Sequence, residues 1–498
     1  MVLLLALAAL VVQTPESRCA AVASWRLPDT KIAAAQFVAA VDATAPGPVH
    51  VAHCKVTGTI GSEIGFAVWL PETWNGRFLM SGGGGFVGDV PGPGAGLDRG
   101  FAVTATDTGH RSSGTDARWA LNNLERQINF GYLATHRTAE TAKAIVRQYY
   151  GHDAERSYFD GCSTGGRQGL MEAQRFPADF DGVISGAPVY DWTRALSAAI
   201  KNAQAAFPDP ASITAPLVTP DNLKLVQRAA LDACDAKDGV ADGLIDDPRV
   251  CHFDLKSVKR CDGAAAADCL TDAQREAIGK VYSPVRDTSG AVIYEGQPVG
   301  GEGEPGSWDA WVTGVNPRTA GVPNLAWGFG TQFFRNFVFA DPNWSYRGYD
   351  IAASWRRDTR LVATFMDADN PDLSAFRAHG GKLLLWHGWA DPALNPLATI
   401  RYYESVIAKD ASAAGDVRLF MLPGVLHCAG GPGPDTVDWA SVIDAWVEKG
   451  KAPDRVVAEK KVAGAVARSR PLCPYPQRAV YTGSGSADDA ANFVCRQP

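Results

Sequence analysis

Short apolar runs of strand length alternate with stretches of helical spacing over the first part of the chain. The run 77–85 ends in four glycines, and residues 132–150 carry Ala, Ile and Val at helical intervals before Gly151. Because strands that alternate with helices are typical of a sheet covered on both faces, we expect an α/β fold with a mainly parallel sheet. The predicted strands are 77–85, 101–107, 157–163 and 181–188, and the predicted helices are 132–150 and 164–176.

This alternation disappears between residues 190 and 370, where Pro, Gly, Trp and Asp are frequent, and the pattern predicts an inserted domain with little regular structure. The alternation then returns as a strand at 381–388, a helix near 396–409, a strand at 417–422 and a helix at 439–450. The predicted division is therefore a signal peptide at 1–18, a first part of the core at 19–189, a large irregular inserted domain at 190–370, and a second part of the core at 371–498 that ends in a disulfide-tied tail.

The apolar run at residues 1–12 is too short to cross a bilayer and is typical of the centre of a signal peptide, although no Lys or Arg precedes it. The alternative is a buried first helix. Cleavage after Ala23 would remove Cys19, so we favour cleavage before Cys19. Since no later stretch is apolar and long enough to span a membrane, we expect a secreted or periplasmic protein.

The charge balance restricts the expected partners. The formal net charge is −7 and no run is rich in Lys or Arg, so neither nucleic acid nor an anionic membrane surface is expected to bind. The 14 tryptophans supply large flat surfaces that suit an aromatic small molecule, although most of them are expected in the core. The sequence carries no signal for an oligomeric state.

The strongest chemical signal is Gly161-Cys-Ser163-Thr-Gly165, which matches the G-x-S-x-G nucleophile elbow. A predicted strand precedes it and a predicted helix follows it, which is the context that the motif requires. The glycines allow the tight turn that lifts the Ser163 hydroxyl above the sheet, where the N–H of Thr164 faces a developing oxyanion. The sequence therefore predicts Ser163 as a nucleophile.

A serine hydroxyl needs a base, and the order in this class of hydrolase is serine, acid, histidine. His427 follows the strand at 417–422 and is the predicted base, whereas His387 lies beside the predicted acid and is expected to be structural. Asp391 is that acid, which holds the tautomer of His427 and stabilises its imidazolium form. Three other aspartates are more easily explained as loop and cap residues: Asp369, Asp372 and Asp416.

Cys162 precedes Ser163 and Cys428 follows His427, so these two cysteines approach each other if the triad forms. A disulfide between them would hold the nucleophile and the base together, and two unrelated buried thiols are the alternative. The ten cysteines are even in number, which together with a signal peptide favours disulfides. Spacing alone leaves the other pairings open.

Two further segments suit ligand contacts. The glycines at 82–85 let the backbone approach a substrate closely and suit a second oxyanion donor, although spacing does not decide which N–H donates, and a flexible turn is the alternative. Residues 235–246 place aspartates between glycines, which suits a loop around a hard cation such as Ca²⁺ and equally a pair of metal-free Asp-Gly turns.

At these residues the sequence resembles the tannase and feruloyl esterase family of α/β-hydrolases, whose members cleave gallate, ferulate and terephthalate esters. The resemblance is carried by residues 161–169, 387–391, 423–428 and 470–476. It implies the α/β-hydrolase fold with the insertion as a lid, the triad Ser163, Asp391 and His427, and Gly85 as the oxyanion donor beside Thr164. It also implies the disulfides Cys162–Cys428, Cys19–Cys54, Cys234–Cys251, Cys261–Cys269 and Cys473–Cys495.

The resemblance further implies a structural Ca²⁺ in the lid and no organic cofactor. The ligands would be the side chains of Asp235, Asp238 and Asp242 and the backbone carbonyls of Val240 and Leu244.

The expected activity is that of a serine carboxylic ester hydrolase acting on feruloyl, hydroxycinnamoyl or galloyl esters. Thr164 after the nucleophile is similar to the tannases and feruloyl esterases, whereas the terephthalate enzyme carries an acidic residue there. No arginine in the lid matches a carboxylate clamp, although the segment 308–349 is rich in aromatic residues. Terephthalate half-ester hydrolysis is the alternative substrate, and a non-catalytic aromatic-ligand binding protein is the alternative class. The aromatic residues of the segment include Trp308, Trp311, Trp327, Phe329 and Phe333.

Overall fold

The computed structural model describes residues 14–42, 49–315 and 322–497. The apolar part of the predicted signal peptide, residues 1–12, lies outside this part of the chain. The described chain begins at helix α1 (Pro15–Val22), where the Thr14 hydroxyl accepts a hydrogen bond from the N–H of Ser17. Cys19 on α1 bonds to Cys54, so this helix is fastened covalently to the central sheet.

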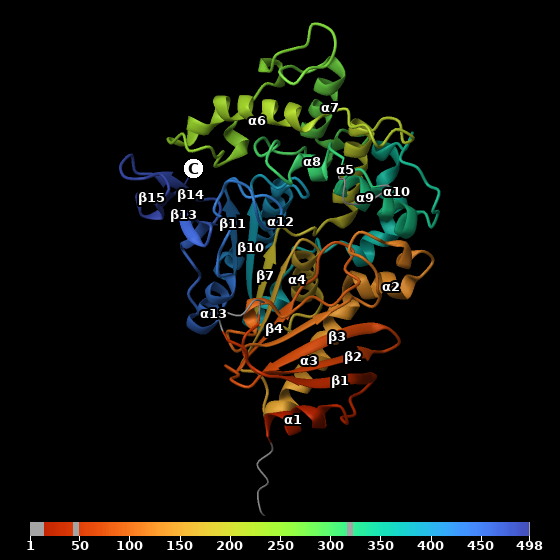
Figure 1. Ribbon diagram of the computed structural model, residues 1–498, viewed down its shortest axis with the longest axis vertical. Coiled ribbons are helices and arrows are strands. Elements are labelled where there is room, and N and C mark those ends of the chain that lie inside the picture. Colours follow the sequence, from red (N-terminus) through yellow and green to blue (C-terminus); the bar gives the residue numbers. More distant parts are fainter. Residues whose placement is uncertain (1–13, 43–48, 316–321, 498) are drawn as a thin grey trace, which may run out of the picture.

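A nine-stranded sheet runs through the molecule (Figure 1) in the order β1-β2-β3-β5-β4-β6-β7-β10-β11. All neighbours from β5 to β11 are parallel, as the sequence predicts. By contrast, β1, β2, β3 and β5 pair antiparallel, forming an edge that the sequence analysis missed. The strands are β1 (Thr30–Val38), β2 (His53–Ile60), β3 (Ile64–Pro71), β4 (Arg77–Ser81), β5 (Ala102–Thr106), β6 (Arg156–Cys162), β7 (Gly182–Gly186), β10 (Lys382–Gly388) and β11 (Val417–Leu422).

Successive residues of the central strands pack on opposite faces of the sheet, and both faces are buried. Phe159 of β6 and Val183 of β7 belong to one hydrophobic core, and their neighbours Tyr158 and Ile184 belong to the other. Helices therefore cover the sheet on both sides, which is the layered arrangement that the alternating pattern predicts. The first core includes residues of α3 (Ala134–Tyr150), α4 (Thr164–Arg175) and α12 (Pro396–Lys409), and the second includes residues of α13 (Trp439–Lys449).

The segment 190–370 is more regular than its composition predicts, so the expectation of little regular structure there is wrong. Helices α6 and α7 each begin at a capping box, Thr219 with Asn222 and Thr271 with Gln274, a start signal that the frequent Pro and Gly residues obscured. The elements of the segment are α5 (Trp192–Ala206), α6 (Pro220–Cys234), α7 (Asp272–Tyr282), β8 (Val285–Arg286), β9 (Val292–Tyr294), α8 (Trp308–Trp311), α9 (Leu325–Phe333) and α10 (Ile351–Met366).

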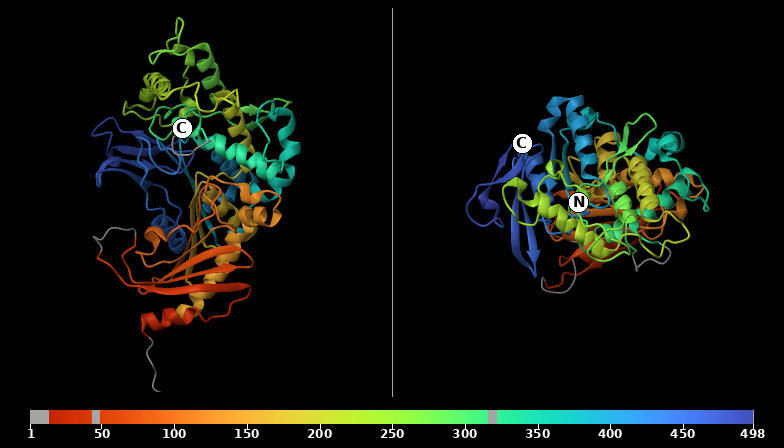
Figure 2. Two further views of the ribbon diagram at one scale, coloured as in Figure 1. Left: turned by 45° about the vertical axis from the view of Figure 1, so that its right-hand side comes forward. Right: turned by 90° about the horizontal axis from the view of Figure 1, so that it is seen from above.

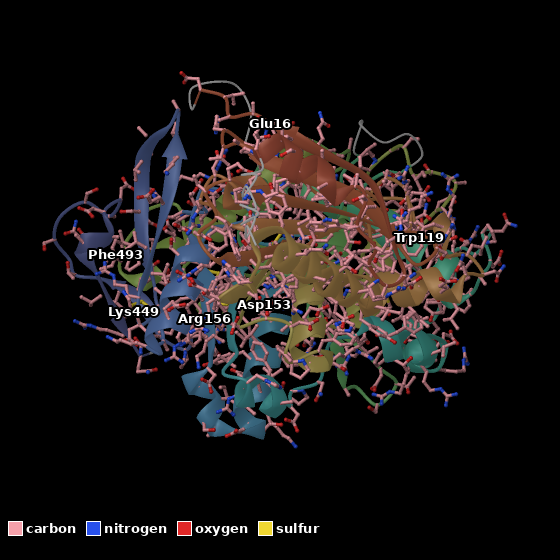
Figure 3. All side chains as sticks on the ribbon, turned by 90° about the horizontal axis from the view of Figure 1, so that it is seen from below. Glu16, Trp119, Asp153, Arg156, Lys449 and Phe493 are labelled. Carbon is pink, nitrogen blue, oxygen red and sulfur yellow. A yellow bond between two sulfur atoms is a disulfide. The ribbon has the colours of Figure 1, made fainter. Side chains whose placement is uncertain are left out.

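The insertion and the amino ends of the parallel strands lie at opposite ends of the molecule. Figure 1 shows α6, α7 and α8 at one end. Figure 3, which views the other end, shows Asp153 with Arg156, the first residue of β6, and Lys449, the last residue of α13. The carboxyl ends of the strands therefore point toward the insertion. Across the described ranges, no helix is both long and apolar enough to cross a membrane.

The tail forms two small hairpins beside the main sheet (Figure 2). They are built from β12 (Val456–Val462) with β13 (Ala465–Leu472), and from β14 (Arg478–Tyr481) with β15 (Phe493–Arg496). The disulfide Cys473–Cys495 ties this tail, as predicted. The other four bonds are also the pairs that the resemblance implies: Cys19–Cys54, Cys162–Cys428, Cys234–Cys251 and Cys261–Cys269. Two short helices complete the fold, α2 (Leu124–Ile128) and α11 (Ser374–Ala378).

Candidate active site

Ser163 lies at the turn between β6 and α4. Its φ of +65° with ψ of −121° is a conformation that residues with side chains rarely adopt, and its N–H donates to the Gly186 carbonyl at 2.9 Å. The turn requires glycine at position 161, because a Cβ there would lie 2.5 Å from the backbone of Gly165. The motif thus forms a strand, a tight turn and a helix, with Ser163 at the carboxyl end of the sheet.

Asp391 and His427 meet at the same end of the sheet. Asp391 follows β10, and its Oδ2 lies 2.8 Å from Nδ1 of His427. Its other oxygen accepts hydrogen bonds from the N–H groups of Ala393 and Leu394 at 2.8 and 3.0 Å. Burial alone would raise the pKa of Asp391, but His427 and His387 outweigh burial and hold it well below its usual range. Asp391 is therefore a fixed anion against the imidazole of His427.

His387 also contacts Asp391, from a different side. Its Nε2 lies 3.1 Å from Oδ2 of Asp391, and its Nδ1 lies 2.7 Å from the hydroxyl of Thr399. The His387 side chain is fully buried, whereas His427 is partly exposed and lines a cavity with Ser163. This geometry favours His427 over His387 as the group that meets a substrate.

The other aspartates that the sequence offered lie in different surroundings. Asp416 pairs with Arg377 at 2.9 Å and with Lys382 at 2.6 Å. Asp369 and Asp372 are exposed, and Asp372 accepts from the N–H of Ser374 at 3.0 Å. None of these three aspartates lines the cavity that holds Ser163, among the residues that the structure describes.

A disulfide joins the two segments that carry Ser163 and His427. Cys162 and Cys428 are bonded, with their Cα atoms 6.0 Å apart, although 266 positions separate them in the sequence. Both cysteines line the same cavity as Ser163 and His427. The bond thus limits how far the strand end and the histidine loop can separate, which supports preorganisation.

Gly85 and Thr164 lie together at the mouth of this turn. Thr164 is the first residue of α4, whose first N–H groups have no acceptor within the helix, and its hydroxyl donates to the Gly85 carbonyl at 2.7 Å. Gly85 has a φ of +55°, and a Cβ there would lie 2.3 Å from the Gly114 carbonyl oxygen. Both residues line the cavity beside Ser163, so their N–H groups are available near a bound carbonyl.

The cavity has a volume of about 270 Å³ and lies between the sheet and the insertion. Trp192, Trp311 and Phe329 form aromatic walls, with Trp311 edge-on to His427 at a centroid distance of 5.0 Å and stacked on Phe329 at 6.1 Å. Trp308, Trp327 and Phe333, by contrast, are buried in the hydrophobic cores. Two of the five aromatic residues named from the sequence therefore line the cavity.

Comparisons with known proteins identify the family of this chain. A family model described as tannase and feruloyl esterase matches residues 49–496. The chain belongs to the tannase and feruloyl esterase family. It is 37% identical to an uncharacterized esterase from Xanthomonas campestris, over 98% of this chain and 92% of the relative. It is 35% identical to mono(2-hydroxyethyl) terephthalate hydrolase from Piscinibacter sakaiensis, over 95% of this chain and 90% of that protein.

A solved structure supports the same assignment. The crystal structure of feruloyl esterase B from Aspergillus oryzae matches with a TM-score of 0.86 and 27% identity, covering 97% of this chain and 100% of that chain. This tannase family member thus has the predicted α/β-hydrolase fold, and it is a carboxylic ester hydrolase.

The cavity wall of this esterase also holds a set of polar groups that the sequence did not predict. Oδ1 of Asn202, Oε2 of Glu295 and Oε1 of Gln297 are buried acceptors without a partner in the protein. Asn202 lies ten residues after Trp192 on α5, so the two residues share a helix face, which also carries Leu196 and Ala199. This helical spacing is the sequence signal that could have indicated Asn202. Glu295 and Gln297 follow β9 in irregular backbone, where the pattern holds no such signal.

Lys201 is the one Lys or Arg among the described residues that line the cavity. Its Nζ donates to the backbone carbonyls of Lys280 and Ser283, both at 2.7 Å, and to that of Val281 at 3.3 Å. Burial lowers the pKa of Lys201 to about 7. These three carbonyls occupy the donors of the ammonium, so Lys201 is poorly placed to hold a substrate carboxylate.

The aspartates proposed as calcium ligands share one loop of the insertion. Both carboxylate oxygens of Asp235 accept from N–H groups of the loop, and Asp242 pairs with Arg470. Burial, with the nearby charges of Asp242 and Asp235, raises the pKa of Asp238 to about 6. These three carboxylates do not all lie within 4.8 Å of one another in the described chain. The repulsion between these carboxylates would be relieved by a bound cation.

Proposed function

We propose that this esterase hydrolyses esters of phenolic aromatic acids by an acyl-enzyme mechanism, with Ser163 as nucleophile. The observation that carries the proposal is the arrangement of Ser163 and His427 on one aromatic cavity, with Asp391 hydrogen-bonded behind His427. Nucleophile, base and orienting acid in this relation define the logic of a serine hydrolase triad.

In the first step, the Ser163 oxygen attacks the ester carbonyl while His427 takes the hydroxyl proton. The carbonyl oxygen becomes an oxyanion, which accepts hydrogen bonds from the N–H groups of Thr164 and Gly85. His427 then gives its proton to the departing alcohol, leaving the acyl group on Ser163. Water deprotonated by His427 attacks this acyl-enzyme, releasing the acid and restoring the serine. Asp391 stabilises the imidazolium form of His427 in both steps.

The cavity walls support a phenolic ester rather than a terephthalate half-ester. The three unpartnered atoms on Asn202, Glu295 and Gln297 are acceptors as assigned, and burying an acceptor without a donor is costly. Phenolic hydroxyl groups supply donors, whereas a carboxylate supplies only acceptors. Asn202 lies about 15 Å along α5 from Trp192, the first residue of this helix. The chain just before the helix adjoins the Ser163 turn, so the Asn202 acceptor lines a part of the cavity away from that turn.

A matched pair of esters tests this substrate class. We expect methyl ferulate to be hydrolysed at least about tenfold faster, as kcat/KM, than methyl cinnamate, which is smaller and lacks the hydroxyl donor. In Asn202→Leu the preference should shrink while the rate on methyl cinnamate is kept, because the acceptor is lost but the apolar wall remains. Methyl gallate and mono(2-hydroxyethyl) terephthalate complete the panel of initial rates.

The same panel separates the alternatives. A clear preference for mono(2-hydroxyethyl) terephthalate would favour the terephthalate activity of the relative from Piscinibacter sakaiensis and contradict the phenolic proposal. No turnover of any ester by folded protein, together with no labelling by a fluorophosphonate, would instead support a binding protein on a hydrolase scaffold.

We also propose that Ca²⁺ binds the loop 235–244 through Asp235, Asp238 and Asp242 and the carbonyls of Val240 and Leu244. Bound there, the ion would neutralise the carboxylates and fix the loop, which the Cys234–Cys251 disulfide closes and the Asp242–Arg470 ion pair attaches to the tail. The role is structural, so no step of hydrolysis passes through the ion.

Removal of calcium is therefore expected to lower the melting temperature by about 3 °C, assuming Ca²⁺ at roughly 100 times its Kd. The measurement is thermal melting with EGTA and with added Ca²⁺. Asp238→Asn should lose most of this response, whereas Asp262→Asn, an exposed aspartate of the same insertion, should keep it. Equal melting temperatures with and without Ca²⁺ would contradict the site.

We further propose that the protein is secreted or periplasmic. The five disulfides support this location, because such bonds persist in oxidising compartments and are rare in the cytosol. Fractionation of producing cells tests the proposal directly.

A further inference from the structure

A second group of ligand-type side chains lies outside the active site. His136 of α3, Glu172 of α4 and Asp179 of the loop after α4 bring one ring nitrogen and two carboxylate oxygens within 4.8 Å of one another. Nδ1 of His136 lies 2.7 Å from Oδ2 of Asp179. Glu172 is eight residues after Thr164, which places it about 12 Å along α4 from the Ser163 turn.

Glu172 is the unusual member of this group. Its side chain is 1% exposed, and neither of its carboxylate oxygens has a hydrogen-bond donor in the protein. A buried carboxylate without a donor or a cation is strongly destabilising. Accordingly, burial and the neighbouring Asp179 raise the pKa of Glu172 well above its usual range. The charge of Lys143 offsets part of this cost, and a proton or a metal cation between the carboxyl groups would offset more of it.

The surrounding residues hold the ligands in place. The ring of Phe176 stacks on the His136 imidazole at 3.7 Å with an interplanar angle of 4°, which fixes its orientation. Lys143 donates to the backbone carbonyl of Asp179. Glu140, one turn after His136, lies 3.4 Å from its Nε2 and is exposed. His136 and Asp179 are only partly buried, whereas Glu172 is fully buried. An ion can therefore enter from solvent past His136 and Asp179.

We propose that a divalent transition metal, with Zn²⁺ as the representative ion, binds between His136, Glu172 and Asp179. One imidazole nitrogen and two carboxylate oxygens are donors that suit Zn²⁺, and water would complete its coordination. The ion would join α3 to the end of α4 and the loop that follows. The role is structural, and it does not depend on the proposed substrate.

The experiment is a Zn²⁺ titration of the full-length protein by calorimetry, with Ca²⁺ present in excess to saturate the loop at 235–244. We expect one Zn²⁺ per chain and a higher melting temperature when Zn²⁺ is added.

Glu172→Gln is the decisive variant, since it keeps the size of the side chain and removes the charge. It should weaken Zn²⁺ binding beyond the roughly 10–100-fold that an outer-shell partner contributes. Asp179→Asn serves as a second variant if Glu172→Gln does not fold, and Asp262→Asn, an exposed aspartate of the insertion, is the control that should bind Zn²⁺ like the wild type. A wild type that binds no Zn²⁺, or a Glu172→Gln protein that binds it unchanged, would overturn the proposal and leave a shared proton between Glu172 and Asp179.

Discussion

Replacement of Ser163 by alanine is expected to lower kcat for ester hydrolysis by about 10⁵–10⁶-fold while the protein stays folded. The oxygen of the Ser163 hydroxyl attacks the ester carbonyl. Without this hydroxyl, His427 has no nucleophile to deprotonate, and no neighbouring group takes its place. The residual rate should come from the oxyanion donors and the binding cavity alone. The measurement is the initial rate on methyl ferulate at saturating substrate, together with labelling by a fluorophosphonate, which should be lost in the variant.

Ser185→Ala is the matched control. Ser185 is a buried serine of β7 whose hydroxyl donates to the Gly166 carbonyl of α4 at 2.8 Å, so it probes the same packing without touching the cavity. This variant should keep labelling and most of the turnover. If Ser163→Ala hydrolysed the ester at the wild-type rate, the acyl-enzyme mechanism would be wrong.

Much of the parallel half of the fold could be predicted because its signals are local. The helix predicted near 396–409 is α12 with those bounds, and the strand predicted at 417–422 is β11. Buried parallel strands read as continuous apolar runs, and their helices carry one apolar face. The strand β1 gives neither signal, because most of its residues are exposed or half-buried, and its place is set by pairing with β2.

The candidate triad could be named from sequence for a similar reason. In a parallel sheet, residues that follow the carboxyl ends of neighbouring strands meet at one edge, so the order of Ser163, Asp391 and His427 along the chain suffices to suggest their meeting. The walls of the cavity could not be named in this way. Gln297 lines it only because the irregular segment after β9 lies against the cavity, which is a tertiary arrangement without a motif.

The two histidines on Asp391 provide the second test of the mechanism. His427→Ala is expected to lower kcat by on the order of 10⁵–10⁶-fold, close to the loss for Ser163→Ala, because nucleophile and base act as one unit. His387→Gln should cost less than about 100-fold, since His387 faces Thr399 and Asp391 and positions the acid without meeting the substrate. The measurement is kcat and KM for both variants on methyl ferulate.

The pH dependence of activity distinguishes a positioning role of His387 from a catalytic role. His387 and His427 together hold the pKa of Asp391 well below its usual range, against the effect of burial. A carboxyl group with a lowered pKa in the folded state contributes stability that is present above its unfolded pKa and lost as pH falls through the folded value. Without His387 the pKa of Asp391 should rise, so on acidification His387→Gln should lose activity at a higher pH than the wild type. Asp391 should also contribute less stability at neutral pH in this variant, so less of the melting temperature is lost through its protonation. If His387→Gln were inactive at all pH values while His427→Ala kept its turnover, the roles of the two histidines would be exchanged, and the cavity-lining position of His427 would have to be explained by substrate binding alone.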